Sequence, residues 1–285
     1  MTMKTNPPIV RVEHVGAFQL ITFNQPETRN PLGPEVVDAL TGALDQAEAD
    51  TGIRAIAIRG AGTTFSAGGN LGNFEERLAA PMNPDGSDPI AVSNRRFGTF
   101  LQRLRRFPKP VVVAAHGAAM GGGAGLVCAA DIALACAYTR FSFTETAIGL
   151  VPAQILPFVV ERIGSQRARR LMLTAHRFDA AEALRLGVVD AVAADMQALR
   201  EQLGEVLDRI GRCAPEALAR TKRLALRCTA EGAESEAALV HLLDDAAHDF
   251  AAQLRGEGGE GVRAAREKRD PSWRVAFDRN ALAEW

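Results

Sequence analysis

The stretch Val111–Cys136, VVVAAHGAAMGGGAGLVCAADIALAC, decides the fold. It opens and closes with short apolar runs, Val111–Ala115 and Ile132–Cys136, which have the length and composition of buried strands. Between them, Gly122–Ala130 consists mostly of small residues and has the length of a short helix. A strand, a helix and a second strand in succession indicate parallel strands covered by helices. The sequence therefore predicts an α/β fold.

The residues before this stretch extend the pattern. Ile9–Val15 and Phe18–Phe23 alternate between apolar and polar residues, and Gly16 between them suits the tight turn of a hairpin. Pro34–Ala49 has apolar residues at helical spacing, with its proline in the first turn, where proline is tolerated. Ile53–Ile58 is predicted to be another buried strand.

The residues after this stretch become mostly helical. Phe141–Phe143 and Val188–Val192 are predicted as short strands. We therefore divide the chain into an α/β core, residues 1–195, and a helical C-terminal region, residues 196–285. The helices predicted from apolar spacing are Pro157–Ile163, Gln166–Thr174, Ala180–Leu186, Met196–Cys213, Pro215–Arg227 and Glu234–Leu254.

The segment between Leu71 and Pro110 departs from the alternation of strands and helices in the α/β core. Ala80–Pro89 is rich in Pro, Gly, Asp and Asn, and a basic, helix-like stretch, Ile90–Phe107, follows it. This composition predicts a mobile insertion on the surface. Its basic side chains are interpreted either as a solvated helix face or as contacts to phosphate groups; they are Arg95, Arg96, Arg103, Arg105, Arg106 and Lys109.

Composition excludes several classes of protein. The 285-residue chain carries 33 Lys and Arg against 34 Asp and Glu, so its charge gives no general attraction to nucleic acid or to an anionic membrane. No apolar run is long enough to span a bilayer. The four cysteines lack CxxC spacing and the N-terminus lacks an apolar signal core, which predicts a reduced, cytoplasmic protein. The five histidines show no metal-ligand spacing, so no metal site is expected.

Two glycine-bearing loops each follow a predicted buried strand. They are Arg59–Leu71, RGAGTTFSAGGNL, and the run Gly121–Gly125. A glycine loop after a strand exposes backbone N–H groups, and one that opens a helix adds the positive end of the helix dipole. Neither loop matches the GxxxxGK[ST] or GxGxxG motif, which disfavours a nucleotide site. Both loops suit developing negative charge, although close packing of a helix on a strand also explains the glycines.

Five segments together carry a resemblance to a known family. FSAGGNL (65–71), AAMGGGAG (118–125) and FTETAIGLVP (143–152) resemble, in that order, the signature segments of the enoyl-CoA hydratase/isomerase (crotonase) superfamily. FNQPETRNPL (23–32) and EKRDPSW (267–273) resemble its first CoA-contacting turn and its C-terminal end. The resemblance implies a spiral of ββα units with a helical C-terminal trimerisation region. It also implies an acyl-CoA thioester substrate, no separate cofactor, and a homotrimer or a dimer of trimers.

The resemblance also implies roles for individual residues. Matched motif to motif, the backbone N–H groups of Ala67 and Gly122 would form an oxyanion hole for the thioester oxygen, and Glu145 would act as general acid and base. A carboxyl group in an apolar acyl pocket is expected to have a raised pKa. The residues implied in substrate binding are Arg29, Ser66, Gly68, Gly69, Asn70, Leu71, Gly121, Gly125, Gln154 and Lys268.

One position departs from the family pattern. The second acidic residue of many family hydratases corresponds to Gly125, which cannot transfer a proton. Glu75 and Glu76 are candidates to replace it, although surface acids are usually solvated. The segments 121–135, 151–164 and 173–190 resemble bacterial hydratases of branched glutaconyl-CoA thioesters, such as 3-methylglutaconyl-CoA and isohexenylglutaconyl-CoA. The distal carboxylate of these substrates would need a partner, for which Arg95, Arg96 or Gln154 are candidates.

Three other side chains are interpreted as structural. His116 lies in the turn before the glycines, Ser66 lies outside a GxSxG motif, and Cys128 has apolar neighbours. The predicted activity is reversible addition of water across the C2=C3 bond of a 2-enoyl-CoA. The alternatives are an isomerase, decarboxylase or acyl-CoA hydrolase of the same superfamily, or a non-catalytic CoA-binding or RNA-associated scaffold.

Overall fold

A six-stranded sheet forms the centre of the protein, in a computed structural model that describes residues 7–69, 79–230, 236–283 and 285. β1 pairs antiparallel with β2, and the other neighbours pair in parallel, which confirms the α/β prediction and the hairpin. The strands, in spatial order, are β1 (Val10–Val15), β2 (Phe18–Phe23), β4 (Ala55–Gly60), β6 (Val111–Ala115), β8 (Ile132–Cys136) and β11 (Ala191–Ala193).

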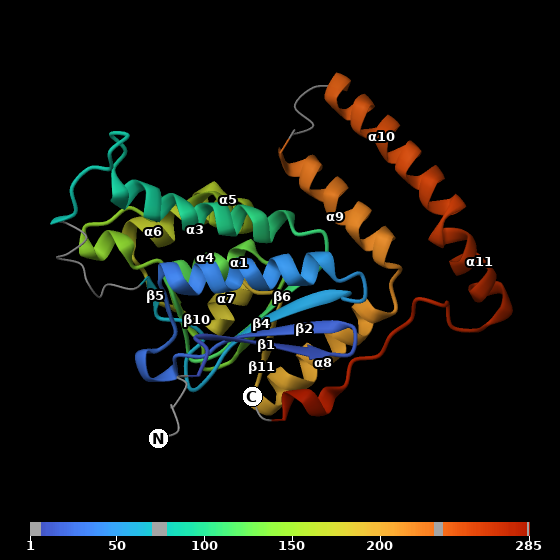
Figure 1. Ribbon diagram of the computed structural model, residues 1–285, viewed down its shortest axis with the longest axis horizontal. Coiled ribbons are helices and arrows are strands. Elements are labelled where there is room, and N and C mark those ends of the chain that lie inside the picture. The colour runs from blue at the N-terminus through green and yellow to red at the C-terminus, as the bar shows by residue number, and fades with distance from the viewer. Residues whose placement is uncertain (1–6, 70–78, 231–235, 284) are drawn as a thin grey trace.

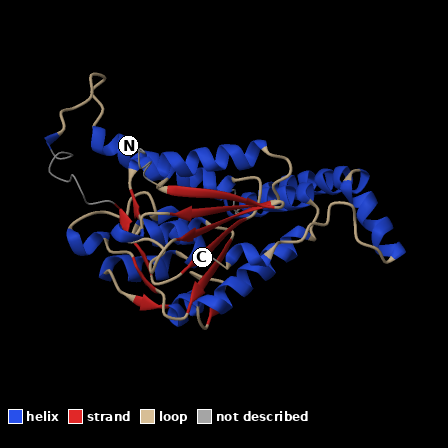
Figure 2. Ribbon diagram, turned by 60° about the horizontal axis from the view of Figure 1, so that its bottom comes forward, coloured by secondary structure: helices blue, strands red, loops and turns tan. Residues whose placement is uncertain are grey.

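Both faces of this sheet are buried, which explains why its strands are apolar runs. In β4, Ile56 and Ile58 pack into one hydrophobic core, whereas Ala55 and Ala57 pack into a second core on the opposite face. Figure 2 shows helices on both sides of the strands. α8 (Met196–Gly211) covers the face of the second core, and the helices α1 (Pro34–Ala49), α4 (Gly122–Ala129), α5 (Leu156–Ile163), α6 (Ser165–Thr174) and α7 (Ala180–Leu186) belong to the first.

Two small sheets bring the glycine loops together beyond the ends of β4 and β6. β3 (Pro31–Leu32) pairs with β5 (Gly68–Gly69), and β7 (Ala118–Met120) pairs with β9 (Arg140–Ser142), which also pairs with β10 (Phe178–Asp179). Ser66 joins the two loops, because its N–H donates to Ala118 O at 3.0 Å and its carbonyl accepts from Met120 N at 3.0 Å.

The helix α3 (Pro89–Arg106) corrects part of the expectation of a surface insertion, since residues 80–88 before it are mostly exposed but the end of the helix is not. Asp88 caps its first turn by accepting a hydrogen bond from Ile90 N at 2.8 Å. Phe100, Leu101 and Leu104 are buried, and the helix packs on α1 and α4. The second half of the helix, from Phe97 onward, therefore belongs to the core, because its apolar residues form a buried stripe despite its basic composition, whereas residues 90–96 are mostly exposed. The expected strand at Val188–Val192 is also shorter than predicted, since β11 begins only at Ala191.

Three C-terminal helices extend away from the sheet (Figure 1). They are α9 (Pro215–Ala230), α10 (Glu236–Arg255) and α11 (Glu257–Glu267). α10 and α11 expose Val240, Leu243, Phe250, Leu254 and Val262. Apolar side chains gathered in this way suit a subunit interface, and the trimer stays a prediction. None of the helices within the described part of the chain is long and apolar enough to cross a membrane.

Candidate active site

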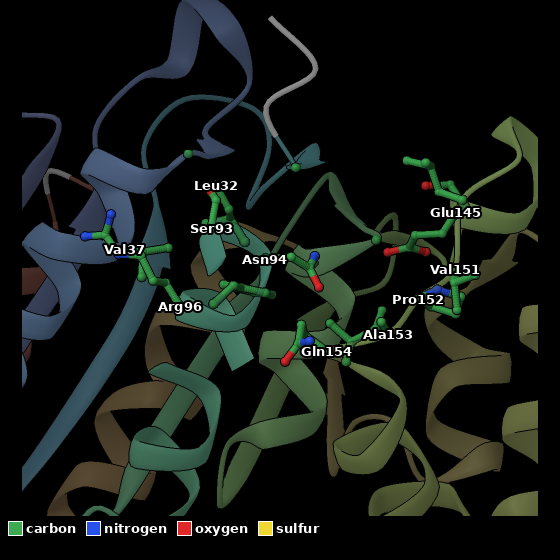
Figure 3. Close-up of a pocket in the computed structure, with 18 of the residues that line it drawn as sticks. Leu32, Val37, Ser93, Asn94, Arg96, Glu145, Val151, Pro152, Ala153 and Gln154 are labelled. Carbon is green, nitrogen blue, oxygen red and sulfur yellow. The ribbon is translucent and has the colours of Figure 1, made fainter. Parts of the chain in front are cut away.

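A cavity of about 260 Å³ opens where the two glycine loops meet α3. Its lining comes from β3 and the start of α1, from β5, from residues 93–97 of α3, from the start of α4, and from residues 144–155. Figure 3 shows Glu145 on one side of this space, Leu32 and Val37 on the opposite side, and Asn94 and Gln154 between them. The site therefore combines segments from over a hundred residues of sequence.

Glu145 brings a carboxylate to this cavity. It begins the 3-10 helix η2 (Glu145–Ile148) and follows Phe143, which is buried. Its Oε2 atom is buried and accepts no hydrogen bond from the described residues. Burial raises the pKa of Glu145 above its ordinary value, since desolvation disfavours the charged form. A carboxyl group of this kind is suited to accept and return a proton near neutral pH.

Ala67 of the first glycine loop lines the cavity, but its N–H group already has a partner within the chain. The Ala67 N–H already donates to Arg29 O at 2.8 Å, so it is not free to bind a substrate oxygen. Ser66 supports the loop, since its hydroxyl donates to Asn30 O at 2.8 Å and accepts from Gly68 N at 3.1 Å. Gly68 has φ +91°, and a Cβ there would lie 2.6 Å from Met120 O. Gly69, the next residue, lines the cavity.

The second glycine loop places a helix N-terminus at the cavity. Gly121 adopts φ +48° and its N–H donates to Ser142 O at 2.8 Å. Gly122 is the first residue of α4 and lines the cavity. The first four N–H groups of a helix have no partner within the helix, and the dipole makes this end positive. The Gly122 N–H is therefore placed to bind developing negative charge.

Ile155 occupies the space beside Gly125. Gly125 is buried in α4 and does not line the cavity, and a Cβ there would lie 2.2 Å from Ile155 Cγ2. Ile155 itself is buried and lines the cavity. The position at which many family hydratases carry a second acid is thus closed by packing.

We predict that Gly125→Ala destabilises the fold by about 1–3 kcal/mol, because the added methyl overpacks against Ile155. Gly42→Ala in α1 is the matched control, since a Cβ there meets nothing within 4 Å. The control should stabilise by about 0.5–1 kcal/mol, the usual helix-propensity gain. Urea unfolding measures both changes. Ile155→Ala removes the Cγ2 atom that lies 2.2 Å from the added methyl, so Gly125→Ala should cost less in the Ile155→Ala background than in the wild type. Equal stability of Gly125→Ala and the wild type would contradict this account.

The other predicted binding residues are distributed unevenly. Gly121 and Gln154 line the cavity, whereas Arg29 and Lys268 do not. Arg29 follows η1 (Pro26–Thr28), and Lys268 follows α11; both have positive φ. Asn70 and Leu71, as well as the candidate acids Glu75 and Glu76, lie outside the described residues.

Most of the predicted basic cluster is used within the chain. Arg96 forms an ion pair with Asp38, and Figure 3 shows its side chain directed away from Glu145. Arg103 pairs with Asp45 and Glu48, Arg105 pairs with Glu161, and the Lys109 ammonium donates to backbone carbonyls. Arg95 differs, because it donates to Thr99 Oγ1 at 3.0 Å and has no acidic partner in the described part of the chain.

The side chains interpreted as structural are buried and engaged in packing. His116 Nε2 lies 2.9 Å from Gly62 O, and burial lowers the pKa of His116. Burial raises the pKa of Cys128 to about 12, which removes the thiolate needed for nucleophilic attack. Within residues 7–69, 79–230, 236–283 and 285, no group of three or more His, Cys, Asp or Glu residues could hold a metal ion.

Comparisons with known proteins agree with this geometry. The sequence profile described as "Enoyl-CoA hydratase/isomerase" matches residues 13–276. The chain belongs to the enoyl-CoA hydratase/isomerase family. Enoyl-CoA hydratase EchA19 of Mycobacterium tuberculosis is 30% identical, over 95% of this chain and 98% of its own length. A relative from Thermus thermophilus, whose name describes it as an enoyl-CoA hydratase, is 36% identical, over 92% of this chain and 99% of its own length.

Solved structures agree with the fold. An enoyl-CoA hydratase/isomerase from Marinobacter aquaeolei has a TM-score of 0.87 and 42% identity, over 93% of this chain and 98% of its own. Pseudomonas aeruginosa AtuE has a TM-score of 0.86 and 41% identity, over 94% and 100%. The protein is therefore a crotonase-fold enzyme of the enoyl-CoA hydratase class.

Several residues that shape the site of this enoyl-CoA hydratase were not identified from sequence. Asn94 and Phe97 reach it from α3, and Ile155 closes the place beside Gly125. The apolar residues within Ile90–Phe107 carried a signal for the buried helix. The contact between Gly125 and Ile155 has no local signal, since the two residues are far apart in sequence.

Proposed function

We propose that Glu145 carries out both proton transfers of the hydration reaction. Its carboxylate accepts a proton from water while the water oxygen bonds to C3 of the enoyl-CoA, and the C2=C3 electrons move to the thioester as an enolate. The protonated Glu145 then donates that proton to C2, and the carboxylate is restored. The observation that supports this is the buried, unpartnered Oε2 atom of Glu145 at the cavity. Its raised pKa favours the return of the proton.

The backbone N–H groups of Gly69 and Gly122 are proposed as the oxyanion hole, in place of Ala67 and Gly122. Ala67, Gly69 and Gly122 all line the cavity, but the Ala67 N–H already donates to Arg29 O. In the β3–β5 register Gly68 lies opposite Pro31, which has no N–H, so Gly68 must supply the hydrogen bonds of that pair. The next N–H along the strand, that of Gly69, then points to the other side.

A double-bond shift is the second candidate function, and the packing of Ile155 against Gly125 favours it. A single carboxylate is sufficient to remove a proton from C2 of a 3-enoyl-CoA and return it to C4. The oxyanion hole stabilises the same enolate in this reaction and in hydration. Product analysis with a 3-enoyl-CoA separates the two activities.

The proposed substrates are branched glutaconyl-CoA thioesters, with their distal carboxylate near Gln154 and Arg95. Gln154 lines the cavity, and its amide has no hydrogen-bond partner within the described residues. Gly98 in α3 makes room for it, since a Cβ at Gly98 would lie 1.8 Å from Gln154 Oε1 and 3.1 Å from Arg95 Nη1. The amide and an arginine without an acidic partner therefore lie beside the same glycine. Arg95 does not line the cavity itself but an adjoining hollow, which shares Ala153 and Gln154 with it, so a carboxylate that passes Gln154 reaches the guanidinium.

This proposal is tested by following loss of enoyl-thioester absorbance with crotonyl-CoA, 3-methylglutaconyl-CoA and isohexenylglutaconyl-CoA. Arg95→Gln should raise KM for the glutaconyl substrates by about 10- to 100-fold, the worth of a charged hydrogen bond, and leave crotonyl-CoA unaffected. Arg103→Gln is the matched control, because Arg103 pairs with Asp45 and Glu48 and does not line the cavity. Preference for crotonyl-CoA, or equal effects of the two variants, would reject the substrate assignment and leave hydration standing.

A further inference from the structure

The attacking water needs a second polar partner besides Glu145. An ordered water is held by two or more hydrogen bonds, and its lone pair must be aimed at C3 if it is to react. Position 125 on α4 cannot supply this partner, since it is glycine and the space beside it is filled by Ile155. The partner must therefore come from another side chain that lines the cavity.

Thr144 is the lining residue whose hydroxyl lies next to the Glu145 carboxylate. A Cβ built on Gly121 would lie 3.0 Å from Glu145 Oε1 and 3.5 Å from Thr144 Oγ1. The two oxygens thus flank the same glycine, at a point where the absence of a side chain keeps the space open. The remaining polar residues of the lining are Ser93, Asn94 and Arg96 on α3, and Gln154.

The hydroxyl of Thr144 is not used by the fold. Thr144 occupies the N-cap position of η2, where threonine usually accepts a hydrogen bond from the next turn. Here it makes no such cap, and no other residue in the described part of the chain bonds to its hydroxyl. The Thr144 hydroxyl therefore lies at the cavity, beside the Glu145 carboxylate, and is available to bind a small polar ligand.

We propose that Thr144 positions the attacking water, an inference that rests on the proposed role of Glu145. The water donates one hydrogen to the Glu145 carboxylate and the other to Thr144 Oγ1, which leaves a lone pair directed at C3. Only the first hydrogen is transferred as the C–O bond forms. The second stays on oxygen and becomes the hydroxyl hydrogen of the product, so the threonine is unchanged. Thr144 thereby supplies geometry that a second acid would otherwise provide.

The test compares two reactions that share Glu145 but differ in whether a water must be aimed at C3 as the nucleophile. One is the hydration of crotonyl-CoA; the other is exchange of the C2 protons of butyryl-CoA with deuterium oxide, followed by NMR. Thr144→Val should lower kcat for hydration about tenfold or more, with KM unchanged, and should leave C2 exchange within about twofold. Thr144→Ser, which restores the hydroxyl, should recover most of the hydration rate.

Each other outcome overturns the inference in a recognisable way. If hydration and exchange fall together in Thr144→Val, the threonine supports the site as a whole and does not position water. Full hydration by Thr144→Val excludes any role for the hydroxyl. If the wild-type enzyme exchanges C2 protons but hydrates nothing, the proposed hydration fails first, and the isomerase candidate takes its place.

Discussion

Glu145→Gln should slow hydration by about 10²- to 10⁴-fold, the usual contribution of a positioned acid–base group. The amide is nearly the same size as the carboxyl group but cannot accept the proton of water or return one to C2. Acyl-CoA binding should persist, because Glu145 forms no ion pair with the described residues and its Oε2 atom has no hydrogen-bond partner among them. Loss of enoyl-thioester absorbance gives the rate, and isothermal titration with a saturated acyl-CoA gives the affinity.

The pH dependence of the hydration rate tests the role of Glu145 independently. Glu145 must be ionised to accept a proton, and burial raises its pKa. Activity should therefore decline, as the pH falls, at a higher pH than an ordinary glutamate would give, and this acidic limb should be missing from the residual activity of Glu145→Gln.

Glu182→Gln is the control for a glutamate outside the site. Glu182 forms ion pairs with Arg170 and Arg185, and hydrogen bonds with Arg170 and His176 lower the pKa of Glu182. This variant should keep the wild-type rate and pH profile. A Glu145→Gln enzyme with normal hydration would reject Glu145 as the proton carrier and return attention to the acids in residues 70–78.

The strands and helices of the core could be predicted from the sequence because their apolar patterns are local in the chain. The runs Val111–Ala115 and Ile132–Cys136 are strands with the predicted bounds, since both faces of the sheet are buried and each strand is apolar throughout. Pro34–Ala49 likewise has the predicted bounds, with proline in its first turn. Where polar and apolar signals conflicted, as in Ile90–Phe107, charge suggested a surface segment although one stripe of the helix is buried.

The site was predicted less completely, because its details depend on contacts between distant residues. The motifs located both glycine loops and Glu145, and all three meet at one cavity. A motif cannot show which N–H of a loop is already bonded, and the bond from Ala67 to Arg29 decides that question. Nor does glycine at position 125 reveal what fills the space beside it, which is Ile155.

Replacing Gly122 by proline should lower kcat by about 10²- to 10³-fold, because proline removes one N–H group from the oxyanion hole. Gly122 is the first residue of α4, a position that accepts proline without breaking a helical hydrogen bond. Gly122→Ala is the matched control. It retains the N–H, and its Cβ meets the same Phe97 ring, at 3.3 Å, as the proline Cβ would.

The comparison of proline with alanine therefore isolates the backbone donor from the added bulk. Similar rates for Gly122→Pro and Gly122→Ala, with similar melting temperatures, would remove Gly122 from the oxyanion hole. The variants Gly69→Pro and Gly69→Ala test the second donor in the same way. A Cβ at Gly69 meets nothing within 4 Å, so Gly69→Ala should keep the wild-type kcat. If Gly69→Pro also keeps the wild-type kcat, the N–H of Gly69 does not bind the thioester oxygen. Another N–H group of the loop must then be the second donor of the oxyanion hole. Two proline variants that each lose activity, beside two active alanine variants, would locate the enolate charge between the two glycine loops.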